Sequence, residues 1–194
     1  MKIEGKETTV AQNQAAIVEF ISTMAKFQEA NYNIPKMSNK TRKRAPFKSP
    51  EQMILAKGKV MQGQPLPAEV RKMRAKECFM NASHLVMDNH HKGWQYAEGF
   101  AMDGLLPVLH AWAVDENAKV IDPTWPTPET TAYLGIVYDW QDYSKLMMKT
   151  GMFGVLGNDF RVVWEVLKHG GIPPMENIQI EKAQRKRARQ DLEL

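Results

Sequence analysis

The chain has 194 residues and a formal net charge of +4. Its hydrophobic content of 43% supplies enough apolar side chains for the core of one compact domain. So mild a charge is compatible with an anionic partner but identifies none. The single cysteine, Cys78, excludes an internal disulfide and favours a reducing, cytoplasmic setting. No apolar run approaches the ~18 residues that a membrane span requires.

The N-terminal part of the chain is predicted to form two helices joined by a linker. Apolar residues at three- and four-residue steps indicate an amphipathic helix over residues 8–31. Residues 33–50 contain three prolines and form either a solvated linker or a contact for phosphate groups. Ser49, as an N-cap before Pro50, predicts a second helix that ends near Met61. The linker residues that would contact phosphates are Lys40, Arg42, Lys43 and Arg44.

The middle of the chain is predicted to combine one helix with a run of strands. Residues 77–87 carry an apolar face and contain no proline or glycine, which predicts a helix that starts at or near Cys78. A polar turn over 88–93 ends it. Alternating side chains predict a strand over 94–102, and strands over 108–114 and 119–122 are expected to pair as an antiparallel hairpin.

The C-terminal part is predicted to return to helices. A short strand over 132–138 precedes helices over 140–149 and 158–168, and residues 181–194 form a charged helix or tail. We therefore divide the chain into an N-terminal helix and basic linker (1–45), a core (46–175) and a charged C-terminal tail (176–194).

Three residues in the middle of the chain suggest nucleophilic catalysis. A cysteine attacks only as its thiolate, which a helix N-terminus or a nearby imidazolium favours. Cys78 is predicted at a helix N-terminus, and His110 on a strand beside that helix. Asp122 follows His110 by 12 residues (122 − 110), so a hairpin with its tip near residue 116 places the two on neighbouring strands. A carboxylate there accepts the second ring N–H of His110 and orients the ring.

Each of these residues also has an interpretation without catalysis. A lone cysteine is usually a small buried apolar residue, His110 can be a hydrogen-bonded core histidine, and Asp122 can form a turn. The remaining candidates for metal ligands lack the spacing of a zinc site, so we expect no metal and no other cofactor. These candidates are His84, His90 and His91.

The order of the motifs resembles the transglutaminase-like branch of the papain-like cysteine hydrolases. The resemblance lies within residues 76–125 of the chain. Short proteins with this pattern are expected in phages and bacteria. The matching residues are Cys78, Tyr96 and Gly99, then His110-Ala111-Trp112, then Ile121-Asp122-Pro123-Thr124.

The resemblance implies an α+β fold, in which a helix bearing Cys78 packs on a small antiparallel sheet bearing His110 and Asp122, with extra helices at both ends. It also implies acyl transfer. The thiolate would attack an amide or ester carbonyl of a protein or peptide substrate, and water or an amine would resolve the thioacyl-enzyme. Peptide hydrolysis, glutamine deamidation and amine cross-linking share this chemistry.

The oxyanion hole is the part of the site that the sequence defines least. Papain-like relatives often carry a glutamine a few residues before the cysteine, but the nearest upstream glutamine here is Gln64, 14 residues before Cys78 (78 − 64). The backbone N–H of Cys78 is then the expected donor. Asn81 is equally compatible with a hydrogen bond to backbone, and Trp112 with a place in the core. Side chains that would donate to the oxyanion or position the substrate are Asn81, Gln95, Tyr96 and Trp112.

A second function stays open beside the enzyme. A protein with the same fold that does not use the three residues would act by binding, with its basic segments contacting a nucleic acid or an acidic partner. Phosphate contacts of this kind weaken as the salt concentration rises.

Overall fold

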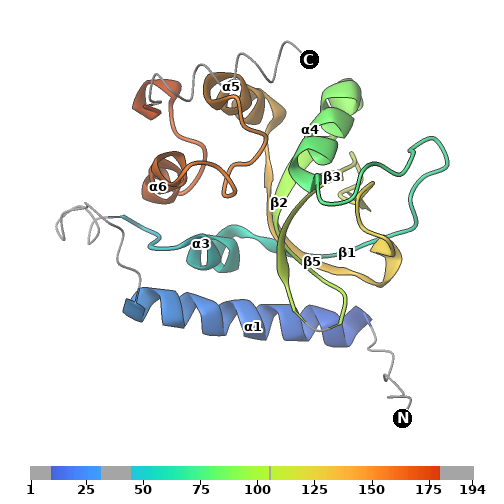
Figure 1. Ribbon diagram of the computed structural model, residues 1–194, viewed down its shortest axis with the longest axis horizontal. Coiled ribbons are helices and arrows are strands. Elements are labelled where there is room, and N and C mark those ends of the chain that lie inside the picture. The colour runs from blue at the N-terminus through green and yellow to red at the C-terminus, as the bar shows by residue number, and fades with distance from the viewer. Residues whose placement is uncertain (1–9, 32–44, 105, 180–194) are drawn as a thin grey trace.

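The computed structural model describes residues 10–31, 45–104 and 106–179 and confirms an α+β fold (Figure 1). Its centre is a curled sheet in which every pair of neighbouring strands is antiparallel, in the order β1-β5-β2-β3-β4. The strands are β1 (Lys59–Gln62), β2 (Gln95–Met102), β3 (Val108–Val114), β4 (Val120–Ile121) and β5 (Ala132–Tyr138). The α-helices are α1 (Val10–Asn31), α3 (Pro50–Lys57), α4 (Cys78–Asn89), α5 (Trp140–Thr150) and α6 (Phe160–His169).

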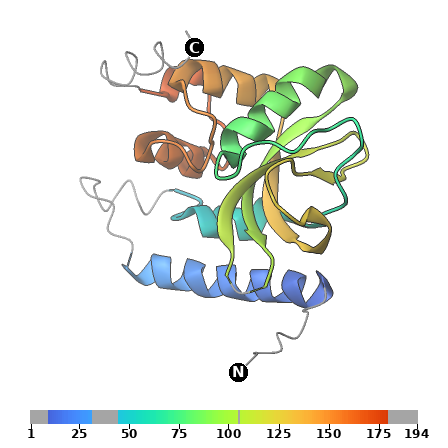
Figure 2. The same cartoon turned by 45° about the vertical axis from the view of Figure 1, so that its right-hand side comes forward.

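The first helix lies along one edge of the molecule, below the sheet in both ribbon views (Figure 2). It packs on α3 and β5. Ile17 and Ile21 on its inner side are fully buried in the main core, so the helix is part of the packed fold. The predicted phosphate-contacting residues and the charged tail over 181–194 lie outside the described residues; the former are Lys40, Arg42, Lys43 and Arg44.

The helix predicted from Ser49 to about Met61 is wrong in its second half. Ser49 caps α3 as expected, because its hydroxyl accepts a backbone N–H of the first turn. The helix ends at Lys57, where Gly58 turns the backbone to an extended conformation (ψ 165°). The next residues form β1, which pairs with β5. A ladder with a strand far along the chain overrides the local pattern here.

The elements predicted between residues 77 and 168 are present, with two differences. The predicted strand over 119–122 is shortened to β4, because Asp122 leaves the ladder and accepts hydrogen bonds from its own turn. The polar turn predicted over 88–93 is mostly helical, since α4 runs on to Asn89 and a 3₁₀ turn follows before Gly93 (φ 85°). The 3₁₀ segments are η1 (His90–Lys92), η2 (Pro128–Thr130) and η3 (Met175–Asn177).

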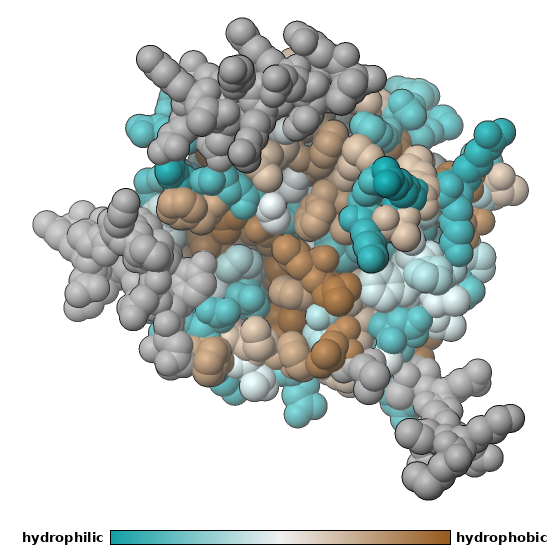
Figure 3. Space-filling model, in the orientation of Figure 1, coloured by the Kyte–Doolittle hydropathy of each residue, from teal (hydrophilic) through white to brown (hydrophobic). Residues whose placement is uncertain are grey.

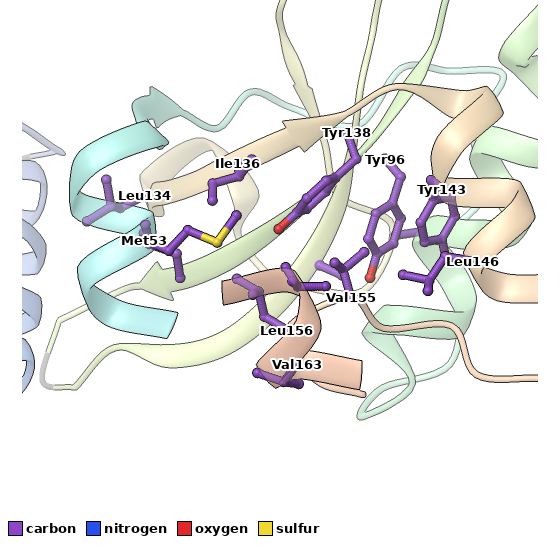
Figure 4. Close-up of a cluster of buried hydrophobic side chains, with 14 of the residues drawn as sticks. Met53, Tyr96, Leu134, Ile136, Tyr138, Tyr143, Leu146, Val155, Leu156 and Val163 are labelled. Atoms are coloured by element: carbon purple, nitrogen blue, oxygen red, sulfur yellow. The ribbon is translucent and has the colours of Figure 1, made fainter. Parts of the chain in front are cut away.

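The two faces of the sheet bury different clusters. One face carries Tyr96 and Tyr138, and packs against the helices in the main core (Figure 4). The opposite face carries Trp112 and Tyr133 in a smaller core. Because side chains alternate along a strand, His110 points to the same face as Trp112.

Gly135 lies where β5 approaches the smaller core. A Cβ there would lie 2.5 Å from the ring of Trp112 and 2.7 Å from the carbonyl oxygen of Glu98. We expect Gly135→Ala to lower the free energy of unfolding by about 1–3 kcal/mol, because a buried ring and backbone must move. Gly171→Ala is the control, since a Cβ there meets nothing within 4 Å. Chemical denaturation compares the two variants, and equal stabilities would contradict this packing.

The exposed apolar side chains of the described residues are not concentrated on one helix or strand. No helix of the described residues is both long and apolar enough to cross a membrane. On the face shown in Figure 3, apolar side chains gather near the middle and are surrounded by hydrophilic ones. The most exposed large apolar side chains, among them Phe27, Leu106 and Phe160, come from different parts of the chain, so no single helix or strand presents them.

Candidate active site

His110 and Asp122 lie side by side at the end of the β3–β4 hairpin. Nε2 of His110 is 2.7 Å from Oδ2 of Asp122, and both side chains are buried. The hairpin turn is closed by the N–H of Asp115, which donates to the carbonyl of Lys119 at 3.0 Å. The carboxylate of Asp122 can only accept, so Nε2 of His110 carries a proton. Nδ1 is then the ring nitrogen left to exchange a proton with another group.

Asp122 is held by donors on both carboxylate oxygens. The backbone N–H groups of Thr124 and Trp125 donate to Oδ1 at 2.9 and 3.1 Å. The hydroxyl of Tyr133 donates to Oδ2 at 2.9 Å, beside His110. Burial alone would raise the pKa of Asp122, but the hydrogen bond and charge of His110 outweigh it and lower the pKa. The carboxylate is therefore ionised and fixed in one orientation.

His110 interacts with both Asp122 and Cys78. Burial alone would lower its pKa, but the hydrogen bond to Asp122 and the interaction with the thiol of Cys78 outweigh burial and raise the pKa to about 9. At neutral pH the ring therefore carries two protons. The ring of Trp125 meets it edge to face, with centroids 5.1 Å apart.

Cys78 is the first residue of α4 and is 8% exposed. Glu77 precedes it at the N-cap, but no side chain caps the first turn. The N–H groups of that turn, including the N–H of Cys78, are therefore available to an anion, and the helix dipole favours negative charge at this end. A thiolate and a developing oxyanion are the anions that this position suits.

Asn81 lies one turn after Cys78 and is buried. Its side-chain amide donates to the carbonyl oxygen of Arg74 at 2.7 Å and to the hydroxyl of Thr124 at 2.9 Å. Both amide hydrogens are thus engaged, and neither is directed at the thiol. The side chain ties the cysteine helix to the turn that begins at Asp122.

The other three residues considered for the oxyanion or substrate lie on β2 and β3. Gln95 pairs with Val114, four positions along β3 from His110 (114 − 110). Tyr96 points to the opposite face of the sheet, where its hydroxyl donates to Glu98 at 3.1 Å. Trp112 is fully buried, and its indole N–H has no hydrogen-bond partner among the described residues.

Two neighbours of the His110–Asp122 pair are absent from the predicted site. Tyr133 holds Asp122, but nothing local in an Ala-Tyr-Leu-Gly strand distinguishes it from a core tyrosine. The ring of Trp125 lies against the ring of His110 and is nearly perpendicular to it. The Trp that follows Asp-Pro-Thr, three residues after the carboxylate, is the signal that points to it.

Glu98 is a second buried carboxylate, on the opposite face of the sheet from His110. It accepts the N–H groups of Val155 and Gly157, each at 2.6 Å, and the hydroxyl of Tyr96. Burial raises its pKa to about 7, although these hydrogen bonds act in the other direction. Glu98 therefore fastens the glycine-rich loop before α6 to β2. That loop touches Phe79, the residue after Cys78, because a Cβ on Gly157 would lie 2.9 Å from the Phe79 ring.

No metal site emerges elsewhere in the described part of the chain. Among the described residues, no group of three or more histidine, cysteine, aspartate or glutamate side chains is arranged to hold an ion. Two surface pockets have volumes of about 220 and 280 Å³, beside α6 and between α3 and α5. Neither is lined by Cys78, His110 or Asp122.

Comparison with known proteins adds no relative. No family model matches the chain, and neither a curated protein nor a solved structure is significantly similar to it. The chemistry of the site is therefore argued from its own geometry.

Proposed function

We propose that this protein is a cysteine-dependent acyl-transfer enzyme acting on protein or peptide substrates, with Cys78 as nucleophile, His110 as acid and base, and Asp122 as the group that orients His110. One observation carries the proposal. A buried His110–Asp122 pair, joined at 2.7 Å, lies against a cysteine at the N-terminus of a helix. A histidine that served only the core would need neither a buried carboxylate on one nitrogen nor an interaction with a thiol.

The proposed reaction begins with the proton of the Cys78 thiol on Nδ1 of His110. The sulfur attacks the acyl carbonyl, and the N–H of Cys78 stabilises the oxyanion. His110 returns the proton to the leaving amine, so that the C–N bond breaks and a thioester remains on Cys78. Water or a second amine then gives a proton to His110 and attacks the thioester, which releases the product and restores the thiol.

The family resemblance supports the same chemistry. An antiparallel sheet carrying His110 and Asp122, with the cysteine helix packed on β3, is the arrangement that the transglutaminase-like resemblance implies. The need for a free thiol fits a reducing, cytoplasmic setting. Hydrolysis, deamidation and cross-linking differ only in the group that resolves the thioester.

Intact-mass spectrometry with an electrophilic acyl probe tests the proposal. We expect one adduct on the wild type, none on Cys78→Ala, and at least ~100-fold slower labelling of His110→Ala. Since the chain contains one cysteine, an adduct on a thiol is an adduct on Cys78. His84→Ala is the matched control, because His84 lies exposed on the same helix and should label at the wild-type rate.

The outcome that contradicts the proposal is equally definite. If iodoacetamide alkylates Cys78 of the folded protein no faster than free cysteine at pH 6.5, and His110→Ala leaves the rate unchanged, the cysteine is not activated. A binding role through the basic segments would then be favoured. Salt-dependent affinity for duplex DNA would support it.

A further inference from the structure

We infer that the exposed segment of residues 71–76, which leads into Cys78, recognises an acidic stretch of the substrate next to the reacting carbonyl. The inference rests on the proposed function, since it names the class of peptide that the same site would take. It depends on how this segment is fixed and on the charge that it presents.

The 71–76 segment has no regular secondary structure, yet hydrogen bonds hold it against the site at three points. The N–H of Met73 donates to the carbonyl of Pro123 at 2.8 Å. The ammonium of Lys72 donates to the carbonyl of Pro126 at 2.7 Å. The carbonyl of Arg74 accepts the Asn81 amide at 2.7 Å. The segment therefore lies between the turn that follows Asp122 and the helix that begins at Cys78.

This fixed segment presents an excess of positive charge. All four of its basic side chains are exposed. The carboxylates of Glu69 and Glu77 flank them, and Glu77 pairs with Arg74 at 3.0 Å, which leaves two more cations than carboxylates over residues 69–77. Arg71 and Lys76 form no ion pair with a carboxylate of the described residues. The four cations are Arg71, Lys72, Arg74 and Lys76.

Lys76 also has an unusual backbone. Its φ of 69° lies in the left-handed region, which glycine adopts without strain and lysine does not. The chain turns there directly into α4, two residues before the nucleophile. A Lys76→Gly substitution removes the charge and relieves the strain together, and the relief of strain offsets the conformational entropy that glycine adds to the unfolded chain.

The proposed reaction indicates which class of anion these cations bind. An acyl-transfer site needs a carbonyl that a thiolate can attack, and a peptide supplies it together with aspartate or glutamate side chains. A nucleic acid offers phosphates to the same cations but no acyl group for Cys78. Complementary charge beside the site chiefly raises the association rate, and salt weakens it.

A pair of peptide thioesters tests the inference. The two share one acyl group, flanked by glutamates in one and by glutamines in the other, so that they differ in charge and hardly in shape. We expect the wild type to acylate from the acidic peptide about tenfold faster at low salt, as kcat/KM, and this preference to fall as salt is added. The double variant Arg71→Gln/Lys76→Gly should reduce the preference to about twofold.

Lys145→Gln/Lys149→Gln on α5 is the matched control, because it removes the same charge from two exposed lysines on another element. It should keep the full preference. Equal rates for both peptides with the wild type, an undiminished preference in the Arg71/Lys76 variant, or an equal loss in the control would each overturn the inference. If, in addition to equal rates for the two peptides, duplex DNA bound the wild type and not the Arg71/Lys76 variant, the cations would serve a nucleic acid and not a peptide.

The neutral acyl probe separates this inference from the proposed function. If the probe labels Cys78 equally fast in the wild type and in Arg71→Gln/Lys76→Gly while the peptides show no charge preference, the substrate class is wrong and the enzyme stands. If the probe fails to label Cys78 at all, both are wrong.

Discussion

If Cys78 is acylated as proposed, an Asp122→Asn variant is expected to form the acyl-enzyme about 10²–10⁴-fold more slowly than the wild type, while remaining folded. The reason is the arrangement of donors around the carboxylate. Oδ1 accepts two backbone N–H groups, so the asparagine oxygen takes that place and the NH₂ group takes the place of Oδ2. There it faces the N–H of His110 and the hydroxyl of Tyr133, both of which need an acceptor. The ring then takes the wrong tautomer or turns away from Cys78.

The pH dependence should change together with the rate. The Asp122 carboxylate contributes to raising the pKa of His110 from 6.5 to about 9, so the wild-type rate should decline only as the pH rises through about 9. In Asp122→Asn this alkaline limit moves to lower pH. The stability of the fold is expected to change with pH in the same direction as the rate. The raised pKa of His110 stabilises the fold fully below about pH 6.5, and this contribution is lost as the pH rises through about 9.

Tyr133→Phe is the control for Asp122→Asn, because it removes a donor from the same oxygen and leaves the negative charge. We expect its rate to fall by less than about tenfold, which is what the loss of one net hydrogen bond allows. Rates of acylation over pH 5–10, together with the pH titration of the His110 ring by NMR, measure both effects. An Asp122→Asn enzyme with the wild-type rate and an unshifted titration would remove Asp122 from the mechanism.

The hydrogen-bonded pair of His110 and Asp122 could be predicted because its geometry is local. Asp122 follows His110 by 12 residues, and a hairpin between them brings their two strands together. The register pairs Ala113 with Ile121, so Asp122 reaches His110 diagonally and not from the position directly opposite. The helix that starts at Cys78 was equally visible, from its apolar spacing. Both predictions depend only on residues within a single helix or a single hairpin.

What escaped prediction depends on contacts between distant parts of the chain. β1 looked like the end of a helix, because its partner β5 is supplied more than 70 residues later. For Asn81 the sequence left a backbone hydrogen bond open beside the oxyanion, but its spacing marks neither Arg74 nor Thr124 as the partner. Glu98 lies on an alternating strand, where nothing local shows that a loop near residue 155 will cover it.

Replacing Glu98 by alanine is expected to lower the free energy of unfolding by about 3–5 kcal/mol. The fully buried carboxylate is the acceptor for the buried N–H of Val155 and the partly buried N–H of Gly157, and an alanine at this position would leave both without this partner. Each such group costs about 1–3 kcal/mol. Tyr96→Phe is the control, because it removes only the hydroxyl that donates to the same carboxylate, and should cost about 1 kcal/mol. Urea denaturation at pH 7 measures both variants.

The pH dependence of stability isolates the charge of Glu98. Its pKa is raised from 4.5 to about 7 in the folded protein, so it binds a proton more tightly there than in the unfolded chain. Its contribution to stability is therefore full below about pH 4.5 and is lost as the pH rises through about 7. Glu98→Gln resembles the protonated side chain and cannot ionise, so its unfolding free energy should depend less on pH between 5 and 7 than that of the wild type. Parallel curves for the two proteins would mean that Glu98 is already ionised at pH 5 and that the hydrogen bonds from the loop outweigh its burial.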